Sequence, residues 1–244
     1  MSHTANTIIR AEKLNKAFGS VKPARDVTVH IAERSVIGLI GTNGAGKTTF
    51  VNMLTGYIKP DSGRIHFRDR DITGQEPRKI TRLGMARSFQ IPQLFTSLTA
   101  RENIEIALSV AGLPLDDADA GLVRLGVLEF AEMNVGLLPE GVRKLLDIAL
   151  AMVGKPEVLL LDEPTSGVAS EEKFDVMDRV LHAAREMGVT VLFVEHDMDI
   201  VRRYSDRVLA FYDGAILADG EPDTVLADVK VRELIIGEEV AIHA

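Results

Sequence analysis

Hydrophobic residues follow different periods along this chain, and the change of period predicts a mixed α/β protein. Val27, Val29 and Ile31 alternate with polar residues, as in a strand that is buried on one face only. Residues 158–161 and 189–194 are largely apolar, which is typical of central strands covered on both faces, and residues 36–40 form a further apolar strand. We therefore expect a sheet covered by helices, together with β structure near the start of the chain.

Between Thr99 and Ala151 the spacing of apolar residues becomes helical, and no β-rich run occurs. This stretch predicts a helical subdomain set into an α/β core. We therefore expect one domain, in which residues 1–90 and 152–244 form the core with a β subdomain, while residues 91–151 form the helical subdomain.

Turn residues mark two further elements after that subdomain. A helix with one apolar face is expected from about Ser170, and Gly188 should end it. A hairpin is expected over residues 207–220, because Asp213-Gly214 is the strongest short signal for a hairpin turn.

The composition is that of a globular protein, and it narrows the possible partners. The 244 residues are 46% hydrophobic and 26% charged, and the net charge of −8 argues against nucleic acid, whose phosphates are held by clustered Lys and Arg. The absence of cysteine excludes a disulfide scaffold and a thiolate zinc site. We expect no secretory signal, and no run approaches the roughly 20 apolar residues that cross a bilayer. Any membrane part is therefore expected from other subunits.

A glycine-rich loop follows the apolar run 36–40 and matches the P-loop pattern in full. Its glycines let successive N–H groups turn inward toward phosphate oxygens, and the helix expected from Lys47 adds a partial positive charge. We expect Lys47 to bind the β- and γ-phosphates and the Thr48 hydroxyl to ligate Mg²⁺. A chance glycine-rich turn is the alternative, which the full match and both flanks disfavour. The residues expected to hold the triphosphate are Gly41, Thr42, Asn43, Gly44, Ala45, Gly46, Lys47, Thr48 and Thr49.

An apolar run at residues 158–161 ends in two adjacent acids, Asp162 and Glu163. Alone this pair is weak evidence, because solvated charges often begin a loop. Together with a phosphate loop upstream it predicts hydrolysis, in which Asp162 supports Mg²⁺ and Glu163 acts as the base for the attacking water. A module that senses nucleotide without turnover is the less favoured alternative, because Glu163 is intact.

With these motifs in this order, the chain resembles the ABC ATPases. The resemblance implies that Gln90, which ends the run Arg87-Ser-Phe-Gln, contacts Mg²⁺ and the membrane subunits. It also implies that His196 contacts the γ-phosphate and that Phe18 stacks on adenine beside Val21. Core packing of Phe18 and an ordinary exposed His196 are the plainer alternatives. The implied fold is a P-loop NTPase core with an antiparallel β subdomain and an inserted helical subdomain, and the implied cofactors are ATP and Mg²⁺.

A narrower resemblance points to the ATPases that power uptake of branched-chain amino acids and amides. It rests on Phe18-Gly19, Ser88-Phe89-Gln90, residues 99–104 and residues 231–238. It implies transmembrane permease subunits as partners, a periplasmic binding protein that acts indirectly, and a location on the cytoplasmic face of the inner membrane. Residues 91–103 would face the membrane subunits. A lipopolysaccharide-type exporter is the alternative, and a non-transport ABC ATPase is a more distant one.

The signature loop, which in this family contacts the ATP held by the opposite subunit, is altered in this chain. Pro139 lacks the hydroxyl that a serine usually supplies there, and Glu140 brings a negative charge toward a phosphate. Two alternatives are open. The chain works in a heterodimer with a second ATPase, which we favour, or the variant signature functions as it stands in a homodimer. The residues of this loop are Leu138, Pro139, Glu140, Gly141 and Val142.

Overall fold

The structure is a computed structural model, and it describes residues 6–237. The chain divides into two compact units, of which one takes the residues up to 83 and from 192 onward and the other takes residues 84–191. The boundary falls within strand β8 (Thr190–Val194). The predicted core (residues 1–90 and 152–244) and helical subdomain (residues 91–151) are defined by sequence pattern and not by compactness. They therefore stay a prediction. Glu238, part of the ending quoted above, lies outside the described residues.

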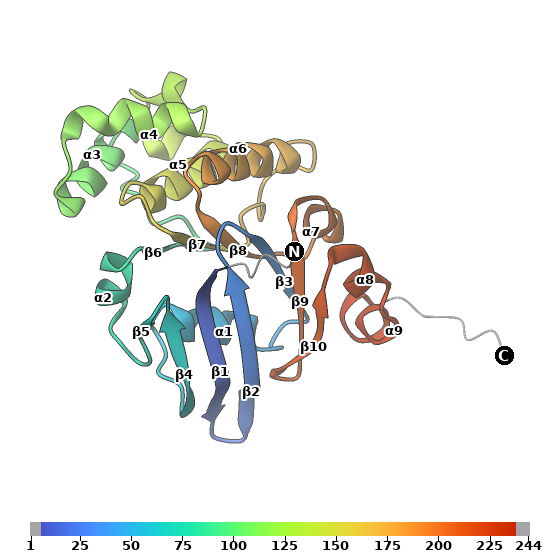
Figure 1. Ribbon diagram of the computed structural model, residues 1–244. Coiled ribbons are helices and arrows are strands. Elements are labelled where there is room, and N and C mark those ends of the chain that lie inside the picture. The colour runs from blue at the N-terminus through green and yellow to red at the C-terminus, as the bar shows by residue number, and fades with distance from the viewer. Residues whose placement is uncertain (1–5, 238–244) are drawn as a thin grey trace. The chain divides into compact units, whose positions relative to one another are not determined.

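Four antiparallel strands open the first unit: β1 (Thr7–Phe18), β2 (Val21–Ala32), β4 (Ser62–Phe67) and β5 (Arg70–Asp71). They pair in the order β2-β1-β4-β5, and Figure 1 shows the long β1 and β2 side by side. The predicted alternation of β2 is confirmed, because Val27, Val29 and Ile31 are buried while the residues between them are exposed. Ala11 of β1 lies opposite Val29, and Leu14 lies opposite Val27, so the two strands share one apolar face.

A second group of strands in the first unit carries the phosphate loop: β3 (Val36–Gly41), β9 (Arg207–Tyr212) and β10 (Ala215–Gly220). β3 runs parallel to β9 and is buried along its whole length, as the apolar run predicts. The hairpin between β9 and β10 is confirmed, and its turn residues Asp213 and Gly214 have φ angles of +45° and +77°. Position 214 requires glycine, because a Cβ there would lie 2.3 Å from the carbonyl oxygen of Lys22.

The helices of the first unit are short, and the first of them follows the phosphate loop directly. In that helix Phe50 packs against Phe211 of β9, with the ring centroids 5.4 Å apart. This contact anchors the helix to the strand that flanks β3. The helices are α1 (Lys47–Leu54), α2 (Pro77–Arg82), α7 (Met198–Tyr204), α8 (Pro222–Ala227) and α9 (Val229–Val231), and a π-helical turn follows at Arg232–Ile236.

The second unit contains two parallel strands and four helices with three 3₁₀ turns between them. The predicted helical pattern between Thr99 and Ala151 is confirmed. The helix expected from Ser170 begins at Lys173, because the chain first makes a turn in which the Glu172 N–H donates to the Ala169 carbonyl at 2.9 Å. The elements are β6 (Met85–Ser88), α3 (Ala100–Ala111), η1 (Leu115–Asp117), α4 (Ala118–Arg124), η2 (Leu128–Phe130), η3 (Val135–Leu137), α5 (Glu140–Met152), β7 (Val158–Asp162) and α6 (Lys173–Glu186).

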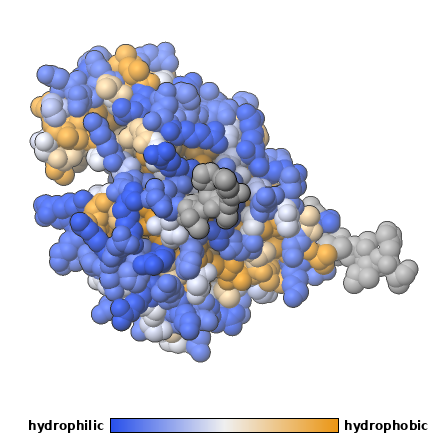
Figure 2. All heavy atoms as spheres, in the orientation of Figure 1, coloured by the Kyte–Doolittle hydropathy of each residue, from blue (hydrophilic) through white to orange (hydrophobic). Residues whose placement is uncertain are grey.

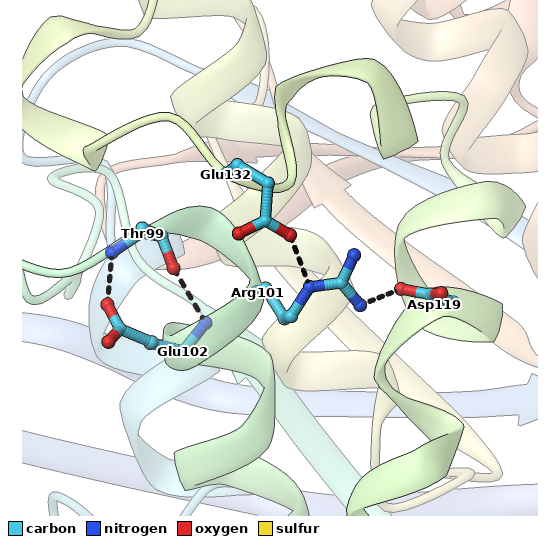
Figure 3. Close-up of polar contacts among 5 residues, drawn as sticks. All are labelled: Thr99, Arg101, Glu102, Asp119 and Glu132. Carbon is cyan, nitrogen blue, oxygen red and sulfur yellow. Dashed lines mark hydrogen bonds and ion pairs between the residues drawn. The ribbon is translucent and has the colours of Figure 1, made fainter.

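The start of α3 is fixed by polar contacts that Figure 3 shows together. The Thr99 hydroxyl accepts the N–H of Glu102 at 3.1 Å, and the Glu102 carboxylate accepts the N–H of Thr99 at 2.7 Å, which makes a capping box. Arg101 donates to Glu132 at 2.7 Å and also to Asp119 of α4. One guanidinium thus links α3 to α4 and to the loop after η2 (Figure 3).

Within residues 6–237 no helix has both the length and the apolar character that a membrane span needs. The surface nevertheless carries hydrophobic side chains, and Figure 2 shows several of them gathered around α3. Ile91 and Phe95, in the loop that precedes α3, are among the exposed hydrophobic residues of this unit.

Candidate nucleotide-binding and catalytic site

The phosphate loop adopts a backbone that only glycine tolerates at two of its positions. Gly41 ends β3 with φ of +151°, and a Cβ there would lie 2.4 Å from the carbonyl oxygen of Phe211. Gly46 has φ of +109°, and a Cβ there would lie 2.1 Å from the carbonyl oxygen of Pro23. At Gly44, with φ of +81°, the space is open. The loop is therefore held tightly between β2 and β9 at its ends and faces open space in its middle.

Lys47 and Thr48 occupy the first turn of α1, as the sequence predicts. The ammonium group of Lys47 is buried within the loop and donates to the carbonyl oxygens of Gly41, at 2.5 Å, and Thr42, at 3.1 Å. Thr48 is exposed. Gly46 caps α1 without any side-chain hydrogen bond to the first N–H groups of the helix. These N–H groups and the lysine give the loop the chemistry of a phosphate-binding site.

Phe18 and Val21 lie opposite each other at the tip of the β1–β2 hairpin. Their side chains are 52% and 62% exposed, so the core-packing alternative for Phe18 is wrong. The ammonium group of Lys16 lies 5.3 Å from the centroid of the Phe18 ring. An exposed aromatic ring at a hairpin tip is available for stacking against a planar ligand.

His196 follows β8 and is exposed. Its backbone N–H donates to the carboxylate of the buried Glu195 at 3.1 Å. The next residue, Asp197, caps α7 by accepting the N–H of Asp199 at 3.2 Å. The turn that presents His196 is therefore held from both sides.

In the second unit, Asp162 ends β7 and forms an ion pair with Arg87 of β6. The Arg87 guanidinium donates to an Asp162 carboxylate oxygen at 2.8 Å, and the two side chains are only 8% and 12% exposed. Parallel pairing of β6 with β7 places both residues near the carboxyl ends of their strands. A buried ion pair of this kind orients the carboxylate that the sequence assigns to Mg²⁺.

Glu163 and Gln90 lie together in the loops that follow β7 and β6. The Gln90 amide donates to a Glu163 carboxylate oxygen at 2.8 Å. Glu163 has φ of +50°, a left-handed conformation that costs a residue other than glycine about 1 to 3 kcal/mol. Such strain is typical of residues whose orientation matters for function.

The signature residues lie at the start of α5. Pro139 is the residue that precedes the helix, so α5 begins at Glu140. Arg143 donates to the carbonyl oxygen of Leu138 at 2.9 Å and lies 3.7 Å from the carboxylate of Glu140. The negative charge that Glu140 adds is thus partly offset within the same turn of helix.

Sequence reasoning missed two buried charged residues in this unit, Lys144 and Asp147, and the part-buried Arg87. Burial raises the pKa of the Asp147 carboxyl, while hydrogen bonds from Ser88 and from backbone N–H groups, together with the nearby Lys144, oppose that rise. Lys144 and Asp147 carried a signal, because charges three residues apart lie on one face of a helix, but that spacing is equally typical of a solvated face.

The first unit therefore brings together the phosphate loop, Lys47 and Thr48, and it also carries Phe18 and His196. The second unit brings Gln90 together with Glu163 and Arg87 with Asp162, and it also carries the signature residues.

Comparisons with known proteins identify the family in which this set of motifs occurs. The ABC transporter family matches residues 24–166 of the chain. The chain is 33% identical to a protein of Archaeoglobus fulgidus named as a probable branched-chain amino acid transport ATP-binding protein LivG, with 95% of this chain and 96% of that protein covered. It is 34% identical to the high-affinity branched-chain amino acid transport ATP-binding protein BraF of Pseudomonas aeruginosa, with 95% and 98% covered.

Among solved structures, the chain is similar to an ATP-binding cassette of an ABC transporter in its ADP conformation. The TM-score is 0.88, the sequence identity is 34%, and the match covers 95% of this chain and 99% of that one. The predicted α/β fold of the P-loop NTPase type, with its antiparallel β and helical parts, is confirmed. This chain therefore belongs to the ABC transporter family, as an ATP-binding cassette that hydrolyses ATP.

Proposed function

We propose that this chain powers the uptake of branched-chain amino acids or related amides, as the ATPase subunit of an ABC importer. The observation that carries the proposal is the match over nearly the whole chain to proteins named for branched-chain amino acid transport. The tight phosphate loop and the Gln90–Glu163 contact supply what an energy-coupling subunit needs.

The test is uptake of radiolabelled leucine, isoleucine and valine by cells of the source organism that lack the gene. We expect uptake to fall and to return with the parent gene but not with Glu163→Gln. Unchanged uptake of all three amino acids and of small amides would contradict the proposal and favour the exporter reading.

The residue roles follow the chemistry of each position. The residues 41–49 hold the triphosphate, Phe18 stacks on adenine beside Val21, and His196 contacts the γ-phosphate. Glu163 is the base for the attacking water, and one of its carboxylate oxygens accepts the Gln90 amide at 2.8 Å in the structure.

Mg²⁺ is the metal that this donor set fits, because hydroxyl, amide and carboxylate oxygens are its preferred ligands. Thr48, Gln90 and Asp162 would hold it, and Arg87 orients the carboxylate of Asp162. The ion would supply charge neutralisation on the phosphates.

Glu163→Gln tests the catalytic role directly. We expect ATP hydrolysis to fall about 100- to 10,000-fold, because the general base is lost, while ATP still binds. Turnover is measured by phosphate release and binding by retention of labelled ATP. Unchanged hydrolysis would remove Glu163 from the role of base.

The proposed assembly contains transmembrane permease subunits and a second ATPase, and a periplasmic binding protein acts on it indirectly. The chain would lie on the cytoplasmic face of the inner membrane. A tagged pull-down from detergent-solubilised membranes, followed by mass spectrometry, tests this. Recovery of permeases together with a different ATPase would support the heterodimer. Recovery of permeases with this chain as the only ATPase would support a homodimer. Recovery of soluble proteins alone would contradict a role in transport.

The heterodimer is favoured by the signature, in which Pro139 has no hydroxyl and Glu140 carries charge. The local pairing of Glu140 with Arg143 supports the other alternative, a signature that works as it stands. Glu140→Gly separates the two. A weak signature predicts faster ATP hydrolysis by the purified chain when Glu140 is replaced, and a working one predicts no gain.

A further inference from the structure

Helix α5 carries two charged side chains that are almost completely buried. Lys144 is 2% exposed and Asp147 is 6% exposed, and the two residues lie three positions apart on one face of the helix. A buried charge is costly unless hydrogen bonds satisfy it. The hydrogen-bond partners of these two side chains therefore identify the segments that this face of α5 holds in place.

Lys144 holds backbone carbonyl groups of the two loops that follow β6 and β7. Its ammonium group donates to the carbonyl oxygen of Gln90 at 2.5 Å, and it lies 3.4 Å from the carbonyl oxygen of Glu163. An ammonium group has three donors, so one lysine can bind both loops at once. Of these two bonds, the one to Gln90 is the shorter.

Asp147 holds the same loop on both sides of Gln90. Its carboxylate accepts the hydroxyl of Ser88 at 2.5 Å and the N–H of Gln93 at 2.9 Å, and the N–H of Phe89 also interacts with it. The loop is thus attached to α5 before, at and after Gln90. Backbone groups fixed at three points leave the chain between them little freedom.

We propose that Lys144 and Asp147 are positioning residues for ATP hydrolysis, which hold the loop from Ser88 to Gln93 and the backbone of Glu163 in the geometry that the reaction needs. The structure shows the result of this positioning, because the side chains of Gln90 and Glu163 meet at 2.8 Å. The proposal rests on the roles proposed above for Gln90 and Glu163. It deepens them by naming what orients the two side chains.

The competing explanation is that these charges only stabilise α5 in its unit. The two explanations differ in a measurable way. A positioning residue changes kcat of the folded protein and leaves the KM for ATP nearly unchanged, since Lys144 and Asp147 bind loop backbone and a serine hydroxyl. A structural residue lowers the melting temperature and leaves kcat of the folded fraction unchanged.

Lys144→Met in the full chain is the first test, because methionine keeps the length of the buried stem and removes the charge. We expect kcat for Mg-ATP hydrolysis to fall about 10- to 100-fold, the effect of misplacing a catalytic group, with KM within about twofold of the parent value. Lys155→Met, at an exposed lysine after α5, is the matched control and should hydrolyse ATP as the parent does. Parent-like kcat for Lys144→Met would overturn the role of Lys144.

Asp147→Leu and Asp147→Asn give an independent test if Lys144→Met does not fold. We expect the Gln93 amide to exchange its hydrogen at least about 10-fold faster in Asp147→Leu, together with a lower kcat. Asp147→Asn keeps an acceptor oxygen and should recover most of both losses. The Phe95 amide, which donates to Asn103 at 2.8 Å, is the internal control and should not change. Parent-like Gln93 exchange and kcat in Asp147→Leu would overturn the role of Asp147.

Glu163→Gln distinguishes failure of this inference from failure of the proposed catalytic role. If Glu163→Gln abolishes hydrolysis while Lys144→Met and Asp147→Leu leave it intact, the positioning role alone is wrong. If Glu163→Gln leaves hydrolysis intact, Glu163 is not the base and the positioning role is wrong with it.

Discussion

The phosphate loop of the first unit and the loops around Gln90 and Asp162 of the second are held in place by different means. In the phosphate loop, backbone packs on backbone: Gly41 and Gly46 pass so close to the carbonyl oxygens of Phe211 and Pro23 that no side chain fits. In the loops around Gln90 and Asp162, buried side-chain charges hold the backbone and the carboxylates.

This difference shows how each region can fail. A loop held by steric contact tolerates no added atom at the contact, whereas most surface changes nearby leave it intact. A loop held by buried charges fails when one partner of a pair is removed, because the other partner is then buried without compensation.

Gly46→Ala should have the largest effect. The new Cβ would lie 2.1 Å from the Pro23 carbonyl oxygen at a left-handed φ of +109°, so β2 or the loop must move. We expect a loss on the order of 3 to 5 kcal/mol in the free energy of unfolding, together with loss of ATP binding. Urea unfolding and labelled-ATP binding measure the two effects.

Gly44→Ala is the matched control for that change, because its φ of +81° is also left-handed while the space around it is open. Only the backbone cost of about 1 to 2 kcal/mol should remain. Equal destabilisation of the two variants would show that conformational strain, and not close approach to β2, restricts the loop.

Arg87→Met should be next in size. Removing the guanidinium leaves the Asp162 carboxylate without its partner. Breaking a fully buried pair costs about 3 to 5 kcal/mol of unfolding free energy, and we expect this range as the upper limit here. Arg25→Met breaks the exposed pair with Asp213 and should cost less than about 1 kcal/mol in urea unfolding. The double variant Arg87→Met with Asp162→Asn should recover part of the loss, and no recovery would argue against charge as the cause.

The two regions also differ in how much of them the sequence reveals. Gly41, Gly44 and Gly46 are visible as a pattern, because close backbone approach admits one residue type. The role of Lys144 and Asp147 is not visible in the sequence, since a lysine and an aspartate on a helix are most often solvated. Their burial depends on β6 and the loops that cover α5, which pair or pack only in the folded unit.

The elements themselves were predictable where a local signal decides them. The Asp213-Gly214 hairpin and the end of α6 before Gly188 have local signals, and both were correctly predicted. The sequence predicts the start of α6 three residues too early, because the turn from Ala169 to Glu172 is made by backbone contacts, for which the Ser170 side chain gives no local signal.

The stability of the second unit should depend on pH through Asp147. Because burial raises the pKa of its carboxyl, the folded chain holds this proton at pH values where the unfolded chain has lost it. This contribution to stability is therefore complete at low pH and is lost as the pH rises through the folded pKa. Lys144, Ser88 and the backbone N–H groups of Phe89 and Gln93 face the carboxyl and limit the effect.

Asp147→Asn removes that titration and should sharpen the comparison. Relative to the parent, the variant should gain unfolding free energy as the pH rises from about 4 to about 8, measured by urea unfolding. A parent and an Asp147→Asn variant with parallel pH profiles would show that the Asp147 carboxyl does not change its proton affinity on folding.

The smallest effect concerns a contact that is neither steric nor buried. Thr99→Ala removes the hydroxyl that accepts the Glu102 N–H and opens the capping box of α3 (Figure 3). The expected cost is about 1 kcal/mol, because water can satisfy the N–H groups at an exposed helix end. Thr96→Ala, at an exposed threonine in the preceding loop, is the control and should cost less. A cost for Thr99→Ala as large as that for Arg87→Met would contradict the distinction between exposed and buried polar contacts on which the comparison rests.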